Sequence, residues 1–103
     1  MSFEKIKALF EKSNIKFAYD HFETPQKLPY GVYRCPSTQN LGADGKVYYT
    51  LNNIFAEIYT KKKSPSIEKQ FETVLDDAEI YYTKNETYID NEKMYQISYE
   101  MRL

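Results

Sequence analysis

Two segments of the chain place their apolar side chains at helical spacing. Residues 3–12 carry most of their apolar side chains on one face and their charges elsewhere. Residues 65–78 have the cleanest pattern, with a stripe made of Ile67, Phe71, Val74, Leu75 and Ala78. Ser2 precedes the first segment and Ser64-Pro65 opens the second, where a serine hydroxyl can accept from the free amide groups of the first turn. The pattern predicts two amphipathic helices, the first of which ends at Ser13-Asn14.

Alternation of apolar and polar residues predicts strands in much of the remaining chain. The last segment is the clearest case, because its odd-numbered positions from Tyr95 to Leu103 are apolar and its even-numbered positions are polar. The other predicted strands cover residues 15–19, 30–35 and 46–60, together with one that starts at 80–83 and turns at 84–86 or at 90–92. Residues 20–29 and 37–45 are predicted connections, and the second is a long loop that ends on the turn signal Asp44-Gly45.

The apolar phase of the 46–60 segment changes midway. Odd-numbered positions are apolar from Val47 to Leu51, whereas even-numbered positions are apolar from Ile54 to Ile58. A strand can follow this pattern if both of its faces are partly covered, or if a bulge resets its register. Asn52-Asn53 is the predicted place of that bulge.

The order of the predicted elements determines the expected fold class. It is α-β-β-β-α-β-β within a single domain, residues 1–103. This order is typical of an α+β fold. We expect a mainly antiparallel β-sheet with the two helices packed on one face.

Composition and charge exclude several classes of protein. The formal net charge is −1, and arginine supplies only two of the 14 basic residues, so no nucleic-acid specificity is expected. No apolar run approaches the roughly 20 residues of a bilayer span, so no membrane partner is expected. The first residues lack a secretory pattern, and the single Cys35 cannot form an internal disulfide. Both features favour a reducing cytoplasm.

Residues with catalytic or ligand chemistry are few. Asp20, His21 and Glu23 are close in sequence, but a strand would bring only two of them to one face, and two ligands do not close a metal site. Cys35 has no cysteine-enzyme signature around it, so we interpret it as a small buried residue at a strand end and not as a nucleophile with His21 as its base. The basic run Lys61-Lys62-Lys63 is interpreted as solvent-facing. We expect no enzyme activity, no catalytic residue, no cofactor and no metal.

The chain is rich in aromatic residues, with 11 tyrosines and six phenylalanines. The predicted core members, which lie on periodic faces, are Phe3, Phe10, Phe71, Tyr95 and Tyr99. The aromatic residues of the 46–60 segment exceed what one sheet face needs, and tyrosine is favoured at protein interfaces. The predicted 37–45 loop is also longer than a hairpin needs, and such loops are often functional. The candidate contact residues from this loop and from the aromatic set are Asn40, Leu41, Gly42, Ala43, Asp44, Gly45, Tyr48, Tyr49, Phe55 and Tyr59. The alternative is that Tyr48 and Tyr49 are core residues.

Several strings resemble one protein family, in order, along nearly the full chain. They are residues 28–33 (LPYGVY), 43–48 (ADGKVY), 57–63 (EIYTKKK), 86–90 (ETYID) and 92–96 (EKMYQ). With them the chain resembles small prophage-encoded proteins of Gram-positive bacteria, from the head–tail junction of siphophages, which have long non-contractile tails. It is similar to the tail-terminator, or tail-completion, type.

The resemblance implies a structural virion assembly protein with an α+β fold and no catalytic residues. Such proteins form a ring, typically hexameric, that caps the tail tube, stops its polymerisation and docks the tail to the head connector. The implied partners are further copies of the chain, the tail tube protein and head–tail connector proteins, and the chain can be a monomer in isolation. The implied location is the cytoplasm of the bacterial host during assembly and then the virion. The alternatives are another neck or minor structural protein, or a small host protein-binding module that pairs by its sheet edge.

Overall fold

The computed structural model describes the backbone of residues 1–103 and their side chains, except the side chain of Tyr48. The helices are α1 (Phe3–Glu11) and α2 (Pro65–Asp77), and a short 3-10 helix, η1, covers Asp90–Glu92. The strands are β1 (Phe17–Tyr19), β2 (Tyr30–Ala43), β3 (Lys46–Thr60), β4 (Thr83–Ile89) and β5 (Met94–Arg102). Apart from η1, this is the predicted element order, and the α+β class is confirmed.

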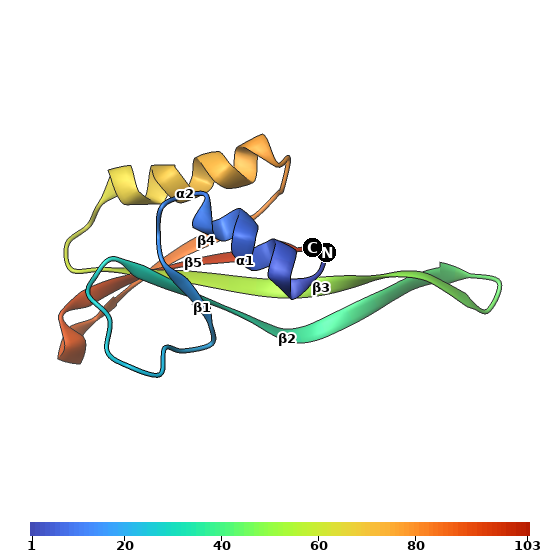
Figure 1. The fold of residues 1–103 in the computed structure, drawn as a ribbon, viewed down its shortest axis with the longest axis horizontal. Helices are drawn as coiled ribbons and strands as arrows, with labels where there is room; N and C mark the ends of the chain where they lie inside the picture. The colour runs from blue at the N-terminus through green and yellow to red at the C-terminus, as the bar shows by residue number, and fades with distance from the viewer.

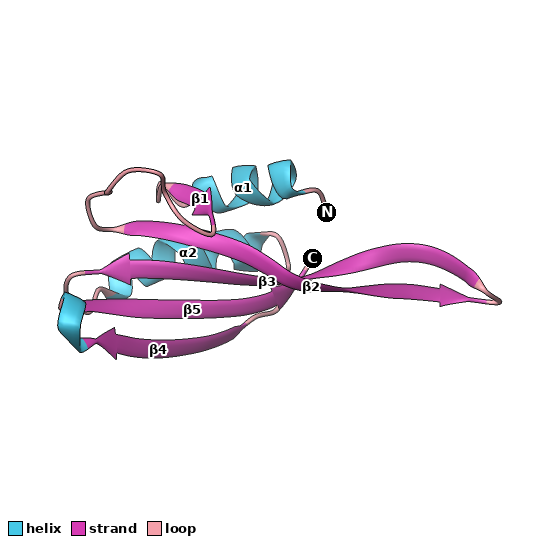
Figure 2. Cartoon of the chain, turned by 90° about the horizontal axis from the view of Figure 1, so that it is seen from below, coloured by secondary structure: helices cyan, strands magenta, loops and turns pink.

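The five strands form one sheet in the order β1-β2-β3-β5-β4 (Figure 2). Neighbouring strands are antiparallel, except that β1 pairs with β2 in parallel. Ile58 of β3 is paired with Gly31 of β2 and with Ile97 of β5, and directly paired residues share a face. Both helices lie on that face of the sheet, as predicted (Figure 1).

The predicted helix starts are confirmed. The Ser2 hydroxyl accepts from the Lys5 amide at 3.2 Å, and the Ser64 hydroxyl accepts from the Ile67 amide at 3.4 Å. Beyond α1 the chain turns at Asn14, whose φ of 66° lies in the left-handed region that asparagine tolerates. The apolar residues that the two helices bury completely against the sheet are Ile6, Phe10, Phe71 and Leu75.

Aromatic rings form the centre of the core. The ring centroid of Phe71 lies 5.1 Å from that of Phe10, 5.4 Å from that of Phe17 and 4.9 Å from that of Tyr99. Phe10, Phe71 and Tyr99 are fully buried, so their predicted place in the core is confirmed. Tyr95 is only half-buried, because it lies near the start of β5, beside the edge strand β4.

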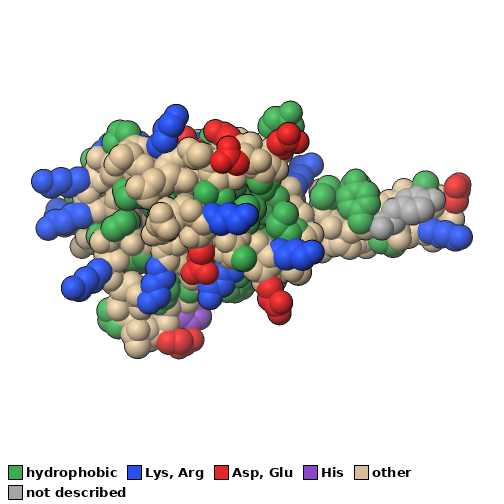
Figure 3. All heavy atoms as spheres, turned by 45° about the horizontal axis from the view of Figure 1, so that its top comes forward, with side chains coloured by type: hydrophobic (Ala, Val, Ile, Leu, Met, Phe, Trp, Pro, Cys, Tyr) green, Lys and Arg blue, Asp and Glu red, His purple; other side chains and the backbone are tan. Residues whose placement is uncertain are grey.

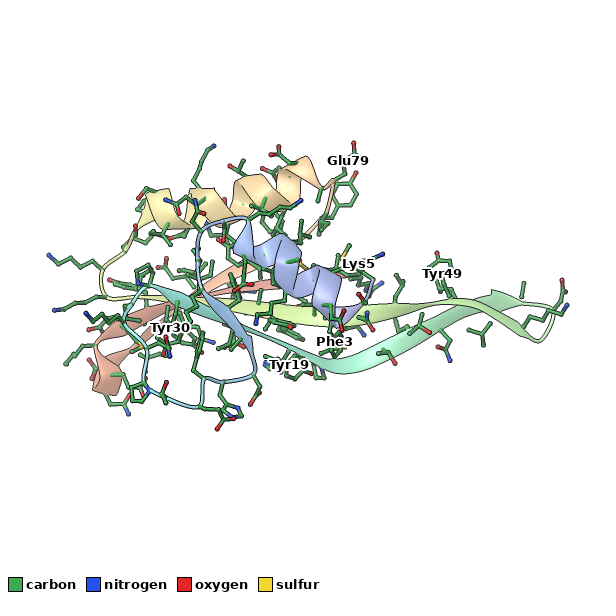
Figure 4. The ribbon with its side chains drawn as sticks, viewed as in Figure 1. Phe3, Lys5, Tyr19, Tyr30, Tyr49 and Glu79 are labelled. Carbon is green, nitrogen blue, oxygen red and sulfur yellow. The ribbon has the colours of Figure 1, made fainter. Side chains whose placement is uncertain are left out.

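The prediction that Phe3 belongs to the core is wrong. Phe3 is 42% exposed, and its ring stacks on Tyr19, which is 43% exposed, with 5.4 Å between their centroids (Figure 4). Phe3 lies in the first turn of α1 and packs on the short edge strand β1, where only part of the ring can be covered.

The predicted loop at 37–45 is wrong for most of its length. Residues 37–43 belong to β2, and only Asp44-Gly45 turns the chain. The φ angles of Asp44 and Gly45 are 55° and 74°, as a two-residue hairpin turn requires. β2 continues past Pro36 because the pairing register shifts between Arg34 and Ser37. Proline is tolerated at such a bulge, where the hydrogen-bond ladder is already interrupted.

The predicted bulge at Asn52-Asn53 is wrong. Asn52 is paired with Thr38 and Asn53 with Ser37, without a shift at that place. The register shifts on the opposite strand, between Arg34 and Ser37, and again near the tip of the hairpin, between Leu41 and Gly42. The change of apolar phase has another cause. From Ile54 onward β3 covers the core, whereas residues 37–51 of the hairpin extend beyond the helices as a two-stranded arm (Figure 1). We call these residues the arm, and the remainder of the molecule the body.

Of the two predicted turns after residues 80–83, the one at 90–92 is confirmed. β4 runs from Thr83 to Ile89, and η1 then leads into β5. The strand begins later than predicted, because residues 80–82 still close the end of α2. The amide of Ile80 donates to the carbonyl oxygen of Leu75 at 2.9 Å.

A cluster of charges joins α2 to the sheet. Lys63 Nζ lies 2.8 Å from Glu68 Oε2 and 2.6 Å from Glu86 Oε1. Lys84 Nζ lies 2.6 Å from both Glu68 Oε1 and Glu72 Oε2. Glu68 is only 3% exposed. Lys63 therefore binds to the body while its side chain stays 44% exposed, and the interpretation of the basic run as solvent-facing is confirmed.

Candidate interaction surface

The arm is the most distinctive surface of the molecule. β1 pairs with β2 at Gly31–Tyr33, and β5 pairs with β3 at Asn53–Thr60. In the arm, residues 37–51, the two strands pair only with each other and extend away from the body to the Asp44-Gly45 turn (Figure 3). The molecule consequently measures 51 Å along its longest axis, against 27 and 22 Å along the other two.

Apolar side chains of the arm are open to solvent. Leu41 is 38% exposed, Val47 is 63% exposed and Tyr49 is 57% exposed. Exposure of this kind on one segment indicates a surface that another molecule can cover. It also excludes the alternative that Tyr49 is a core residue.

Polar contacts across the hairpin stabilise the arm. Thr50 Oγ1 donates to Asn40 Oδ1 at 3.0 Å, and at the base of the arm Asn53 Nδ2 donates to Ser37 Oγ at 2.9 Å. At Gly42 the strands approach closely, since a Cβ atom there would overlap the backbone carbonyl of Lys46. A side chain at Gly42 would therefore force the strands apart near the turn.

The arm contains most of the predicted contact residues. Asn40–Gly45 and Tyr49 lie in it, and the side chain of Tyr48 lies outside the described residues. Phe55 and Tyr59 lie instead in the body, on the face of the sheet opposite the helices, which we call the open face. Phe55 is half-buried there, with the Arg34 guanidinium 4.7 Å from its ring centroid. The structure therefore separates the predicted contact residues into two groups.

Glu57 is the centre of a hydrogen-bond network on the open face. Its side chain is 11% exposed and accepts from Arg34 Nε at 3.2 Å, Tyr59 Oη at 2.8 Å and Gln96 Nε2 at 2.6 Å. These donors come from β2, β3 and β5, so the network ties three strands together. Burial, together with the bond to Glu57, raises the pKa of Tyr59 above its ordinary value of 10.0, so its hydroxyl remains a donor at neutral pH.

Sequence reasoning missed the role of Glu57. The available signal was a single carboxylate within the apolar run from Ile54 to Ile58. A charge at such a position needs partners once it is buried. Those partners are distant in sequence, so alternation alone did not reveal them.

His21 is held between two carboxylates at the surface. Its Nδ1 lies 3.0 Å from Asp20 Oδ2, and its Nε2 lies 3.3 Å from Glu23 Oε1. The hydrogen bond to Asp20, helped by the charge of Glu23, raises the pKa of His21 above 6.5. Among the described residues, no group of three or more His, Cys, Asp and Glu side chains is arranged to hold a metal ion.

Cys35 lies in the bulge of β2 and is half-buried. Its thiol donates to the carbonyl oxygen of Ser37 at 3.2 Å, and its backbone amide donates to the hydroxyl of Tyr19 at 3.0 Å. Cys35 therefore packs at the margin of the core, less deeply than predicted.

Comparisons with known proteins add no assignment, because no protein-family model and no curated protein matches the chain. In the part of the chain that the structure describes, no helix has the length and apolar character needed to cross a membrane.

Proposed function

We propose that the chain is a structural assembly protein of a phage or prophage head–tail junction, of the tail-terminator type, and that the arm joins its copies into a ring. The arm is the observation that carries this proposal. An isolated two-stranded hairpin is marginally stable in water, so a hairpin that extends beyond its core gains from being covered. Leu41, Val47 and Tyr49 supply the exposed apolar area for that contact.

The shape of the molecule suits a ring. A ring requires two unlike surfaces on each subunit, because rotation closes a head-to-tail contact. The arm extends from one end of the body, so it can reach a neighbouring copy without disturbing its own core (Figure 1). One copy would supply the arm and the next would supply the surface that receives it.

The role of the ring follows from the sequence resemblance. In this role the ring, which is typically hexameric in the family that the chain resembles, sits on the head-proximal end of the tail tube and stops tube polymerisation. It then docks the tail to the head connector. The partners are the tail tube protein and the connector proteins, and the protein passes from the host cytoplasm into the virion. Nothing in this role requires a catalytic residue or a cofactor.

A variant with a shortened arm tests the proposal. Removal of residues 39–42 and 47–51 places the pair Ala43–Lys46 directly after the pair Thr38–Asn52 and keeps the Asp44-Gly45 turn. The core of the body is untouched, so circular dichroism should show a folded protein. We expect electron microscopy to show tails of uncontrolled length when this variant replaces the normal protein during phage assembly. Tails of normal length would refute the proposed function.

A pair of tyrosine variants provides the matched control. Tyr49→Ser changes an exposed ring on the arm, and Tyr81→Ser changes a ring on the body that is 95% exposed. We expect Tyr49→Ser to lower the yield of complete virions and Tyr81→Ser to leave the yield unchanged. Equal losses in both variants would show that the effect does not depend on the arm.

The host-module alternative would use the free sheet edge at β4. Its Lys84 and Glu86 are charged residues held in the cluster under α2. Charges on an edge strand disfavour the addition of another strand. This observation favours assembly through the arm over pairing at the edge.

A further inference from the structure

The body has a pocket of about 470 Å³. The elements that line it lie toward the end of the body away from the arm (Figure 1). The loop between β1 and β2 supplies most of its lining, and β2, β3, the end of β4 and Glu92 of η1 supply the rest. Three rings line it: the centroid of Tyr30 lies 5.6 Å from that of Phe22 and 5.3 Å from that of Tyr59. Figure 4 places Tyr30 toward one end of the molecule and Tyr49 on the arm toward the other.

Acidic side chains surround these rings. Asp20, Glu23 and Glu92 line the pocket, and His21 is bound between the first two. Aromatic faces attract ammonium groups, and a lysine can lay its aliphatic stem on the rings while its charge reaches the carboxylates. An ammonium already lies near this wall, since Lys16 Nζ is 5.7 Å from the centroid of Phe22. The pocket therefore has the chemistry to hold a lysine side chain.

We propose that the pocket receives Lys46 from the arm of a second copy, an inference that rests on the proposed function. Lys46 is exposed beside the Asp44-Gly45 turn, at the tip of the arm. The tip and the loop between β1 and β2, which lines the pocket, lie toward opposite ends of the long axis (Figure 1). Contact between them is head-to-tail, which is the geometry that a ring repeats.

Neighbouring charges make the assignment specific. Lys61 and Lys62 lie in the connection between β3 and α2, at the same end of the body as the pocket, so they cannot make this head-to-tail contact (Figure 1). Asp44 lies beside Lys46 at the tip and is repelled by the acidic pocket. Removal of the Asp44 charge should therefore leave the contact intact or strengthen it.

Carbodiimide cross-linking of the full chain at millimolar concentration tests the contact directly. This reagent couples an amine to a carboxylate that touches it, and mixing isotope-labelled with unlabelled protein identifies links between copies. We expect links between Lys46 and Asp20, Glu23 or Glu92 of another copy. A chain that stays monomeric, or that forms links through Lys61 or Lys62 instead, would overturn the inference.

A charge exchange tests the same contact by sedimentation. Lys46→Glu and Glu92→Lys should each weaken self-association by about tenfold or more. An equal mixture of the two variants should restore it, because each arm then meets a pocket of opposite charge in alternating copies. Lys62→Gln and Asp44→Asn should not weaken association. Failure of the mixture to associate would overturn the inference.

These outcomes separate the inference from the proposed function. If Lys46→Glu yields normal tails while the shortened arm does not, the arm acts through another surface and only the inference is wrong. If the shortened arm also yields normal tails, the proposed function is wrong.

Discussion

The charge cluster under α2 allows the effect of burial on the strength of an ion pair to be measured apart from the effect of distance. Lys63 binds two carboxylates at nearly equal distances, 2.8 Å for Glu68 and 2.6 Å for Glu86. The Glu68 side chain is 4% exposed, whereas that of Glu86 is 43% exposed. Substitution of each carboxylate by its amide, Glu68→Gln and Glu86→Gln, changes one charge with almost no change in shape.

Burial predicts unequal losses of stability. Glu68 also binds Lys84, and breaking a buried ion pair costs roughly 3–5 kcal/mol. Each lysine keeps another carboxylate, so the lower end of this range applies, and we expect Glu68→Gln to cost about 3 kcal/mol. Glu86 lies in contact with water, so Glu86→Gln should cost less than about 1 kcal/mol.

Urea unfolding at pH 7 measures both free energies of unfolding. Equal decreases in the free energy of unfolding, or a larger decrease for Glu86→Gln, would refute the argument that burial strengthens the Glu68 ion pairs. The control is Glu79→Gln, which changes an exposed carboxylate beyond the end of α2. Its free energy of unfolding should differ from that of the unchanged protein by less than about 0.5 kcal/mol.

The pH dependence provides a second check. Burial alone would raise the pKa of Glu68, but Lys63 and Lys84 outweigh it and lower the pKa below its ordinary value of 4.5. Because the folded pKa is the lower one, Glu68 contributes its full stability above the unfolded pKa and loses it as the pH falls through the folded pKa. The difference in free energy of unfolding between the unchanged protein and Glu68→Gln should therefore become smaller below pH 4.5. A constant difference would contradict this account.

Three further substitutions test the core and a helix start, each by thermal or urea unfolding. Phe71→Ala removes the fully buried ring at the centre of the aromatic core and should cost about 3–5 kcal/mol; a loss below about 1 kcal/mol would show that this core collapses around the gap. Gly31→Ala should cost about 1–3 kcal/mol, because the added Cβ would overlap the ring of Phe17, and an unchanged midpoint would show that the ring moves freely. Ser64→Ala removes the acceptor of the Ile67 amide and should cost about 0.5–2 kcal/mol, unless water replaces the hydroxyl without loss.

The arm shows most clearly where sequence patterns stop being informative. Its first strand reads Ser37-Thr38-Gln39-Asn40, which has no apolar alternation. The strand conformation of this segment comes from its pairing with β3, and that pairing passes Pro36 because a bulge lies there. Polarity and the proline both favour a loop when the opposite strand is unknown. The turn itself is local, and Asp44-Gly45 indicated it correctly.

Charged residues show the same difference between what sequence neighbours reveal and what distant strands decide. Glu57 and Lys63 stand within or beside β3, and their sequence neighbours do not reveal their partners. Arg34 and Gln96 reach Glu57 from β2 and β5, and Glu86 reaches Lys63 from β4. The sheet order brings these distant segments together, so their hydrogen bonds and ion pairs could not be predicted from spacing.

By itself the sequence determined what local physical chemistry controls. This includes the two helices with their serine starts, the Asp44-Gly45 turn, the alternating last strand and the α+β class. Periodicity and capping act within a few residues, so they can be seen in the chain. The tertiary structure alone decided that residues 37–51 extend as an arm, that Phe3 stays near the surface and that the buried carboxylates Glu57 and Glu68 acquire partners. Each of these depends on which distant segments become neighbours.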